Sequence, residues 1–242
     1  MRTAELQDRL RWLGFDPGPT DGLYGEHTEE AIFDCLDRYT PPPPPPPTHV
    51  VPPAWMPVCT MERVICHWTA GAHKANASYD IPAYHILIEG DGHLVRGSYS
   101  IKDNIDTSDG RYAAHTKNCN GGSIGVSLCC MAGSVENPFD PGPYPMLEQQ
   151  WTMLLAVVAD LCKTYAIPVT PETVLSHAEV QGTLGITQSG KWDYTQLAFD
   201  GSVKGARACG DKLRNDVTAR MAEDIDMTLA IASATPSPVV IP

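Results

Sequence analysis

Apolar residues recur at helical spacing in two short segments at the start of the chain. Three leucines share one face between residues 6 and 13, and Gly14 is well placed to end that first helix. Residues 16–22 (DPGPTDG) are rich in turn residues and predict a structured loop. A second helix is predicted from about His27 to Tyr39, with four residues on its inner face: Ala31, Ile32, Cys35 and Leu36. The first forty residues therefore predict a small all-α domain.

A run of seven prolines at residues 41–47 separates this unit from the rest of the chain. Consecutive prolines favour an extended polyproline II conformation that has no internal hydrogen bonds. Residues 48–57 continue the proline-rich composition. We expect residues 41–57 to form a semi-rigid linker.

After the linker, short apolar runs predict strands, and one long segment predicts a helix. The helix covers residues 146–165, where one face is apolar throughout. Two of the runs flank Gly90-Asp91-Gly92, a turn sequence that favours a hairpin. The predicted strands are residues 63–68, 84–88, 93–97, 123–130 and 174–176. Strands mixed with helices indicate an α/β fold, and we expect a mixed central sheet flanked by helices.

The net charge and the length of the apolar runs argue against nucleic acid and the membrane interior as partners of this protein. The formal net charge is −12, whereas nucleic-acid binding needs clustered Lys and Arg, so we expect no nucleic-acid partner. Apolar runs such as residues 154–158 are far shorter than the ~20 residues that span a bilayer, so no membrane insertion is expected. The first residues also lack the apolar stretch of a secretory signal peptide.

The eight cysteines form no CxxC pair, and Cys129 and Cys130 are adjacent. Without a secretory signal, the default expectation is reduced thiols, several of them buried as small apolar residues. A disulfide between Cys59 and either Cys66 or Cys119 is the alternative for an oxidising compartment.

Two histidines stand at the ends of predicted strands, His67 after Ile65-Cys66 and His177 after Leu175-Ser176. A strand end holds a side chain rigidly, as a metal site requires, although a lone histidine there is more often a hydrogen-bonded polar residue. Asp193 supplies a third possible ligand. Two histidines, one carboxylate and an open position for water are typical of a catalytic zinc site.

The N-terminal unit resembles the helical peptidoglycan-binding domain that is often fused to cell-wall hydrolases. The resemblance covers residues 3–40 and depends on Leu13-Gly14-Phe15, on the loop Asp21-Gly22-Leu23-Tyr24-Gly25, and on Thr28 and Ala31. A generic helical hairpin is the alternative interpretation. The resemblance implies that peptidoglycan is a partner of the protein.

Residues 60–200 resemble the type 2 N-acetylmuramoyl-L-alanine amidases, which share their fold with peptidoglycan recognition proteins. The matching motifs occur in family order: His67-Trp68-Thr69-Ala70-Gly71, Ala83-Tyr84-His85, Ala114-His115, Asn120, Ser123-Ile124-Gly125-Val126, Ser176-His177 and Lys191-Trp192-Asp193. This resemblance implies that Zn²⁺ is the cofactor and that His67, His177 and Asp193 are its ligands. It also implies that Lys191 stabilises the oxyanion of the reaction.

The general base is less clear from the resemblance. Recycling-type members carry a glutamate where this chain has Ser127, and a serine does not take up a proton near neutral pH. Small phage amidases use a tyrosine before a histidine, which implies that Tyr84 orients the water or assists proton transfer. Tyr84 as a strand aromatic and Glu179 as the base are the alternatives.

Three residues are candidates for substrate contacts in the family's cleft: Trp68, His115 and Asn120. His115 has a structural hydrogen bond as its alternative role. Two departures from the family weaken the assignment of Asp193, because the segment from His177 to Asp193 is longer than usual and Tyr194-Thr195 replaces a Pro-Gly pair.

Two other functions remain open at this point. A cysteine-dependent wall peptidase would use Cys66, but adjacent strand residues face opposite sides, so Cys66 and His67 cannot act as a pair. A non-catalytic peptidoglycan-binding protein is the second, and the presence of all three candidate ligands and Lys191 argues against it.

The sequence thus predicts a peptidoglycan-binding domain at residues 1–40, a linker at 41–57, a zinc amidase domain at 58–222 and a tail at 223–242. The expected reaction is hydrolysis of the amide bond between N-acetylmuramic acid and L-alanine. We expect a monomeric phage-type endolysin that is made in the host cytoplasm without a signal peptide. It would act on the cell wall after the membrane is permeabilised.

Overall fold

The computed structural model describes residues 2–38 and 49–234, and the chain divides into two compact units, residues 1–46 and 47–242. The proline run at 41–47 and the last part of the predicted tail, residues 235–242, lie outside the described residues. No helix in the described ranges is both long and apolar enough to span a membrane.

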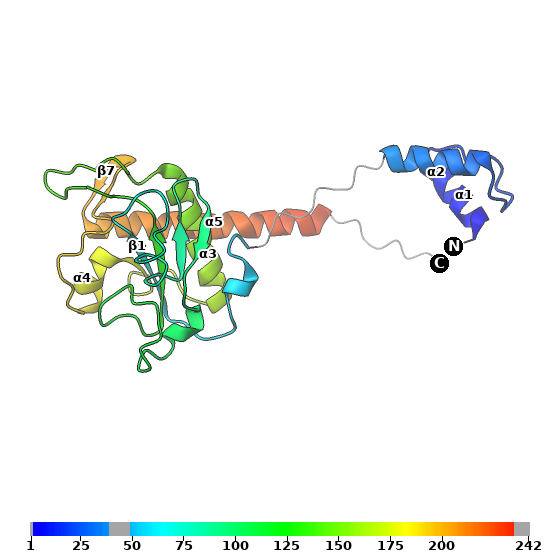
Figure 1. The fold of residues 1–242 in the computed structure, drawn as a ribbon. Helices are drawn as coiled ribbons and strands as arrows, with labels where there is room; N and C mark the ends of the chain where they lie inside the picture. Colours follow the sequence, from blue (N-terminus) through cyan, green and yellow to red (C-terminus); the bar gives the residue numbers. More distant parts are fainter. Residues whose placement is uncertain (1, 39–48, 235–242) are drawn as a thin grey trace. The chain divides into compact units, whose positions relative to one another are not determined.

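The N-terminal unit consists of two helices, α1 (Thr3–Trp12) and α2 (Glu26–Arg38), joined by a structured loop (Figure 1). Gln7 is buried in α1 and holds this loop in place. Its side-chain amide donates to the carbonyl oxygen of Leu23 and accepts the backbone N–H of Gly22. The predicted helix–loop–helix arrangement is therefore confirmed.

The inner face of α2 differs from the predicted one. Ala31 is buried, but Leu36 is 61% exposed. Thr28 is buried instead, and its hydroxyl donates to the carbonyl oxygen of Pro17 in the loop. Ile32 and Cys35 are half-buried, so the fully buried residues of α2 all lie in its N-terminal half.

A five-stranded mixed sheet forms the centre of the second unit. Its strands are β1 (Arg63–Trp68), β2 (Ile86–Ile88), β3 (Leu94–Arg96), β4 (Ser123–Leu128) and β5 (Val174–Ser176). The spatial order is β3-β2-β4-β1-β5, with β3 antiparallel to β2 and the other pairs parallel. The predicted strands and fold class are confirmed, with the hairpin strands and β4 shorter than predicted. β1 lies between two parallel neighbours, β4 and β5, and is almost completely buried.

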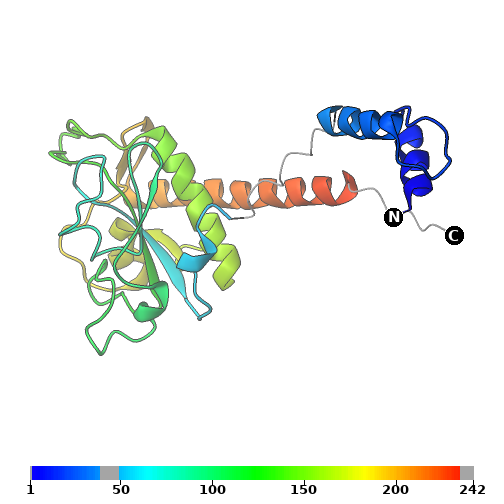
Figure 2. The same cartoon turned by 45° about the vertical axis from the view of Figure 1, so that its right-hand side comes forward.

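Two long helices pack beside the sheet. α3 (Glu148–Tyr165) contacts β1, β2 and β4, and α5 (Ala206–Ala234) crosses α3, as Figure 2 shows. The remaining elements are short: η1 (Pro53–Trp55), η2 (Ile101–Asn104), η3 (His177–Glu179), α4 (Val180–Leu184), β6 (Gln196–Leu197) and β7 (Asp200–Lys204). α5 continues through the position where the sequence predicts the start of a tail, residue 223, so that part of the chain is helical up to Ala234.

Residues 49–57, which the sequence assigns to the linker, pack against the second unit. Val51 is fully buried and Met56 is 9% exposed, and both belong to the main hydrophobic core. The backbone N–H groups of Val50 and Val51 donate to one carboxylate oxygen of Asp160 in α3, at 2.5 and 2.9 Å. The folded unit therefore begins before residue 58, because the apolar residues among these prolines fill a place in the core.

All eight cysteines lie in the described part of the chain, and each is a free thiol. Six are buried, and Cys35 and Cys59 are half-buried. The core of the second unit includes four of the buried thiols: Cys66, Cys130, Cys162 and Cys209.

Candidate metal centre

Parallel strand pairing brings His67 and His177 to the same edge of the sheet. His67 lies near the C-terminal end of β1, and Cys66 pairs with Ser176 of β5. His177 is the next residue after Ser176 and begins η3, so it lies beside His67. Asp193 reaches the same place from the loop that follows α4.

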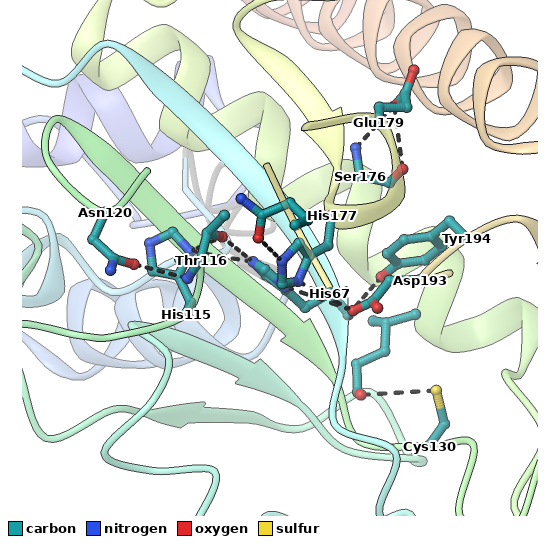
Figure 3. A network of polar contacts seen from close by, with 12 residues as sticks. His67, His115, Thr116, Asn120, Cys130, Ser176, His177, Glu179, Asp193 and Tyr194 are labelled. Carbon is teal, nitrogen blue, oxygen red and sulfur yellow. Dashed lines mark hydrogen bonds and ion pairs between the residues drawn. The ribbon is translucent and has the colours of Figure 1, made fainter. Parts of the chain in front are cut away.

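The three side chains direct one ligand atom each toward a common point (Figure 3). The Nδ1 atoms of His67 and His177 are 3.0 Å apart. Asp193 Oδ2 lies 3.7 Å from the first and 3.8 Å from the second. Donors at ~2.0–2.1 Å from a tetrahedral zinc ion are about 3.3 Å from one another, so the observed spacing fits such an ion.

The hydrogen bonds of His177 leave its Nδ1 atom without a proton. Its Nε2 atom lies 3.0 Å from Gln188 Oε1, an acceptor, so Nε2 carries the hydrogen. The orientation of the Gln188 amide is fixed because its Nε2 donates to the carbonyl oxygen of Lys117 at 2.9 Å. The lone pair of His177 Nδ1 is therefore available for a metal.

The partners of His67 accommodate the same form of its ring. His67 Nε2 lies 3.2 Å from His115 Nδ1, and His115 Nε2 faces the carbonyl oxygen of Ser123 at 3.4 Å. A carbonyl only accepts, so His115 carries its hydrogen on Nε2 and accepts on Nδ1, which faces the Thr116 hydroxyl at 2.9 Å as well as His67 Nε2. The Nε2–H form of His67 suits these contacts and places two Nδ1 lone pairs and a carboxylate oxygen face to face, an arrangement that a cation satisfies.

The interior position of these rings keeps them neutral. Burial lowers the pKa of His67, His115 and His177 below the ordinary histidine value. Burial raises the pKa of Asp193, and the nearby His177 and Lys191 oppose that effect. Neutral imidazoles with one carboxylate are the donor set of catalytic zinc sites.

Gly125 makes room for the ring of His115. A Cβ atom at residue 125 would lie 2.5 Å from that ring, so no larger residue fits without a shift. The backbone N–H of Gly125 also donates to His85 Nδ1, and His85 Nε2 faces Asn104 Oδ1 at 3.0 Å. The glycine of the Ser123–Val126 motif therefore has a packing role beside the site.

Lys191 and Tyr84 lie close to the three candidate ligands. Lys191 is exposed, and its positive charge acts on His67, His177 and Asp193. The Tyr84 ring centroid lies 5.2 Å from that of His67. Burial raises the pKa of Tyr84 above its usual value, so the hydroxyl stays protonated at neutral pH.

The three candidates for substrate contacts lie in the interior. Trp68 is 5% exposed and packs edge-on against Trp192, with ring centroids 4.8 Å apart. Asn120 is buried, and its Oδ1 accepts the backbone N–H of Thr116. Both ring nitrogens of His115 face protein atoms, which favours the structural hydrogen bond over a substrate contact.

Glu179 lies on the far side of η3 from His67, with its carboxylate directed toward Ser176 (Figure 3). It is buried and forms an ion pair with Arg214 at 3.0 Å. This pairing leaves the carboxylate unavailable to a water molecule beside His67, so its role as a base loses support.

Two residues that sequence reasoning missed hold the ligand loop in place. Gln188 contacts His177, as described above, and Tyr194 donates its hydroxyl to the carbonyl oxygen of His67 at 2.8 Å. Tyr194 is fully buried and adopts a positive φ of 61° directly after Asp193. Tyr194, which stands in place of the family's Pro-Gly pair, therefore joins the Asp193 loop to β1. No local sequence pattern predicts this contact or the one between Gln188 and His177.

Comparisons with known proteins agree with this arrangement. The N-acetylmuramoyl-L-alanine amidase family matches residues 57–195, and a peptidoglycan-binding domain family matches residues 2–34. A search of curated proteins finds no match.

Solved structures show only a distant similarity. The endolysin amidase LysCS and the amidase LysC, both from Clostridium intestinale URNW, are each 16% identical to the chain over 53% of its length, with TM-scores of 0.33. The alignments cover 86% and 87% of those two chains. The PlyL structure is 20% identical over 60% of this chain and 82% of its own, also with a TM-score of 0.33.

The amidase family match covers more than half of the chain and includes all three candidate ligands. The chain therefore belongs to the N-acetylmuramoyl-L-alanine amidase family and carries a peptidoglycan-binding domain at its N-terminus.

Proposed function

We propose that this protein is a zinc-dependent amidase that hydrolyses the bond between N-acetylmuramic acid and the L-alanine of the stem peptide in peptidoglycan. The observation that carries the proposal is the buried group of His67 Nδ1, His177 Nδ1 and Asp193 Oδ2 in a family of amidases. Three protein donors leave a position open for water or substrate, as in catalytic rather than structural zinc sites.

In such a site zinc would polarise the amide carbonyl and lower the pKa of a water molecule toward ~7. The chain's own residues supply orientation and charge. Lys191 presents an ammonium group near the carboxylate of Asp193, which suits it to stabilise negative charge that develops on the amide oxygen. Tyr84, protonated at neutral pH, would orient the attacking water through a hydrogen bond rather than remove its proton.

The alternative functions have less support. Cys66 is fully buried in the core, and burial raises the pKa of its thiol, which disfavours the reactive thiolate. A protein that only binds peptidoglycan would have no need of three converging ligand atoms in its interior.

Elemental analysis of purified protein tests the proposal directly. We expect one zinc per chain in the wild-type protein, together with release of free stem peptide from a soluble muropeptide. His177→Ala should lose both, whereas His93→Ala, which alters an exposed histidine, should keep both. A His177→Ala protein that retained one zinc and full hydrolysis would overturn the ligand assignment.

The peptidoglycan-binding domain supports the cell wall as the place of action. Endolysin activity, with release from the producing cell after membrane permeabilisation, stays a prediction. Expression inside a bacterial host with and without a membrane-permeabilising partner tests it, because lysis should require the partner.

A further inference from the structure

The last helix of the amidase unit contacts the segment that carries His177. α5 begins at Ala206, beyond the residues that match the amidase family. Arg214 of this helix is 6% exposed, and its guanidinium donates to both carboxylate oxygens of Glu179, at 3.0 and 3.3 Å. Glu179 lies two residues after His177, so the pair joins α5 to the segment of a candidate ligand.

Arg214 and Glu179 hold the chain on both sides of His177. The same guanidinium donates to the carbonyl oxygen of Val174, at the start of β5, at 3.0 Å. Glu179 Oε2 accepts the backbone N–H of Ser176, the residue before His177, at 2.9 Å. A guanidinium presents its donors as a rigid fork, so it fixes these partners relative to one another, which a single ammonium group cannot do.

Gly210 gives independent support for a close approach at this point. Glycine is a poor helix former, yet it occurs within α5, one turn before Arg214. A Cβ atom at residue 210 would lie 2.0 Å from the carboxylate of Glu179. The helix therefore carries a glycine where it must come close to the Glu179 carboxylate.

The energetics of buried ion pairs separate a role in stability from a role in positioning. Removing one partner leaves an uncompensated buried charge and is strongly destabilising, whereas neutralising both partners often leaves stability unchanged. A pair that only stabilises the fold is therefore replaceable by two neutral residues. A pair that orients a metal ligand is not replaceable in this way, because the orientation depends on the fork of hydrogen bonds.

We propose that Arg214 is a positioning residue for His177, acting through Glu179, so that α5 is needed for metal binding as well as for folding. The inference rests on the proposed zinc site. It assigns no contact between Arg214 and the metal or the substrate.

The experiment compares zinc affinity with stability in Arg214→Met, in Arg214→Lys and in the double variant Glu179→Gln/Arg214→Met. Arg207→Met is the matched control, because Arg207 lies on the same helix with a 95% exposed side chain and shares with Arg214 only the ion pair to Asp211. Zinc affinity is measured by competition with a chromophoric chelator, and melting temperature is measured without metal. We expect Arg214→Met to lose stability and the double variant to regain most of it.

Zinc affinity should nevertheless stay about 10–100-fold below wild type in the double variant and in Arg214→Lys, the usual effect of losing a partner that orients a ligand. Arg207→Met should match wild type in both measurements. A double variant with both wild-type melting temperature and wild-type zinc affinity would refute the positioning role.

A third measurement separates failure of this inference from failure of the proposed function. Long-range ¹H–¹⁵N spectra of the metal-free proteins report which nitrogen of His177 carries the hydrogen. Wild type and Arg207→Met should show the Nε2–H form. The double variant should show a mixture, because a displaced His177 loses its hydrogen bond to Gln188. If the wild-type protein binds no zinc, the proposed function fails. An unchanged spectrum in the double variant would overturn the positioning role of Arg214, whether or not zinc binds.

Discussion

Removal of residues 48–57 should destabilise the amidase unit, although the proline-rich sequence of these residues predicts a linker. The comparison is between a chain that starts at Thr48 and one that starts at Val58. The longer chain keeps the packing of Val51 and Met56 in the core and the two N–H donors to Asp160. The shorter chain loses all of these contacts.

The magnitude follows from what is buried. Burying a Val or Met side chain contributes about 1.5–3 kcal/mol each, and a hydrogen bond to a charged group contributes about 1.5–3 kcal/mol. Asp160 is 3% exposed, so its carboxylate would lose two such bonds in the interior. Even after a discount for water that reaches the carboxylate and for partial burial in the unfolded chain, we expect a loss of at least about 4 kcal/mol.

A loss of this size is a large part of the roughly 5–15 kcal/mol that stabilises a typical domain. At about 2–4 °C per kcal/mol for a unit of this length, the melting temperature should fall by about 8–16 °C. Calorimetry of both chains measures the difference, and Asp160→Asn in the longer chain isolates the carboxylate. Melting temperatures within 2 °C of each other would show that residues 48–57 are a linker after all.

Three further outcomes are expected. Lys191→Ala and Tyr84→Phe should keep one zinc per chain while the rate of muropeptide hydrolysis falls, by roughly 10²–10³ for the lysine. An unchanged rate in Tyr84→Phe would remove that residue from the mechanism. Gln188→Ala should weaken zinc binding about 10–100-fold in a chelator competition assay, with Thr187→Ala, at an exposed neighbouring residue, as the control. Equal zinc affinities of the two variants would contradict the role of Gln188 in fixing the His177 tautomer. The chain starting at Thr48 should hydrolyse a soluble muropeptide normally but co-sediment less with sacculi, because the N-terminal module raises the local substrate concentration. Loss of soluble-substrate hydrolysis in that chain, if folded, would make the module part of the catalytic unit.

The sequence was sufficient for the sheet and for two of the three candidate ligands. His67 and His177 each follow a short apolar run, and parallel pairing brings such positions to one edge of a sheet. Asp193 lies in a loop, so its place beside them depended on family resemblance rather than on a pattern.

Features that depend on tertiary contacts were not predictable. The buried face of α5 carries only one apolar residue per turn, Cys209, Leu213 and Val217, among many polar ones, which gives a weak periodic signal. The packing of residues 49–57 was not predictable because proline content indicates an extended conformation and says nothing about burial. The contact between Gln188 and His177 joins a loop to a strand end, and no local sequence property predicts it.

The free thiols of the amidase unit have a consequence for where the protein can work. Burial raises the pKa of Cys129 and Cys162 to about 12 and that of Cys209 to about 11, so the reactive thiolate is scarce at neutral pH. Since no disulfide holds the described part of the chain together, a reductant has no cross-link there to break, and the six buried thiols react slowly with an oxidant. The covalent structure of the described fold therefore does not depend on the redox potential. The same structure would serve in a reducing and in an oxidising compartment.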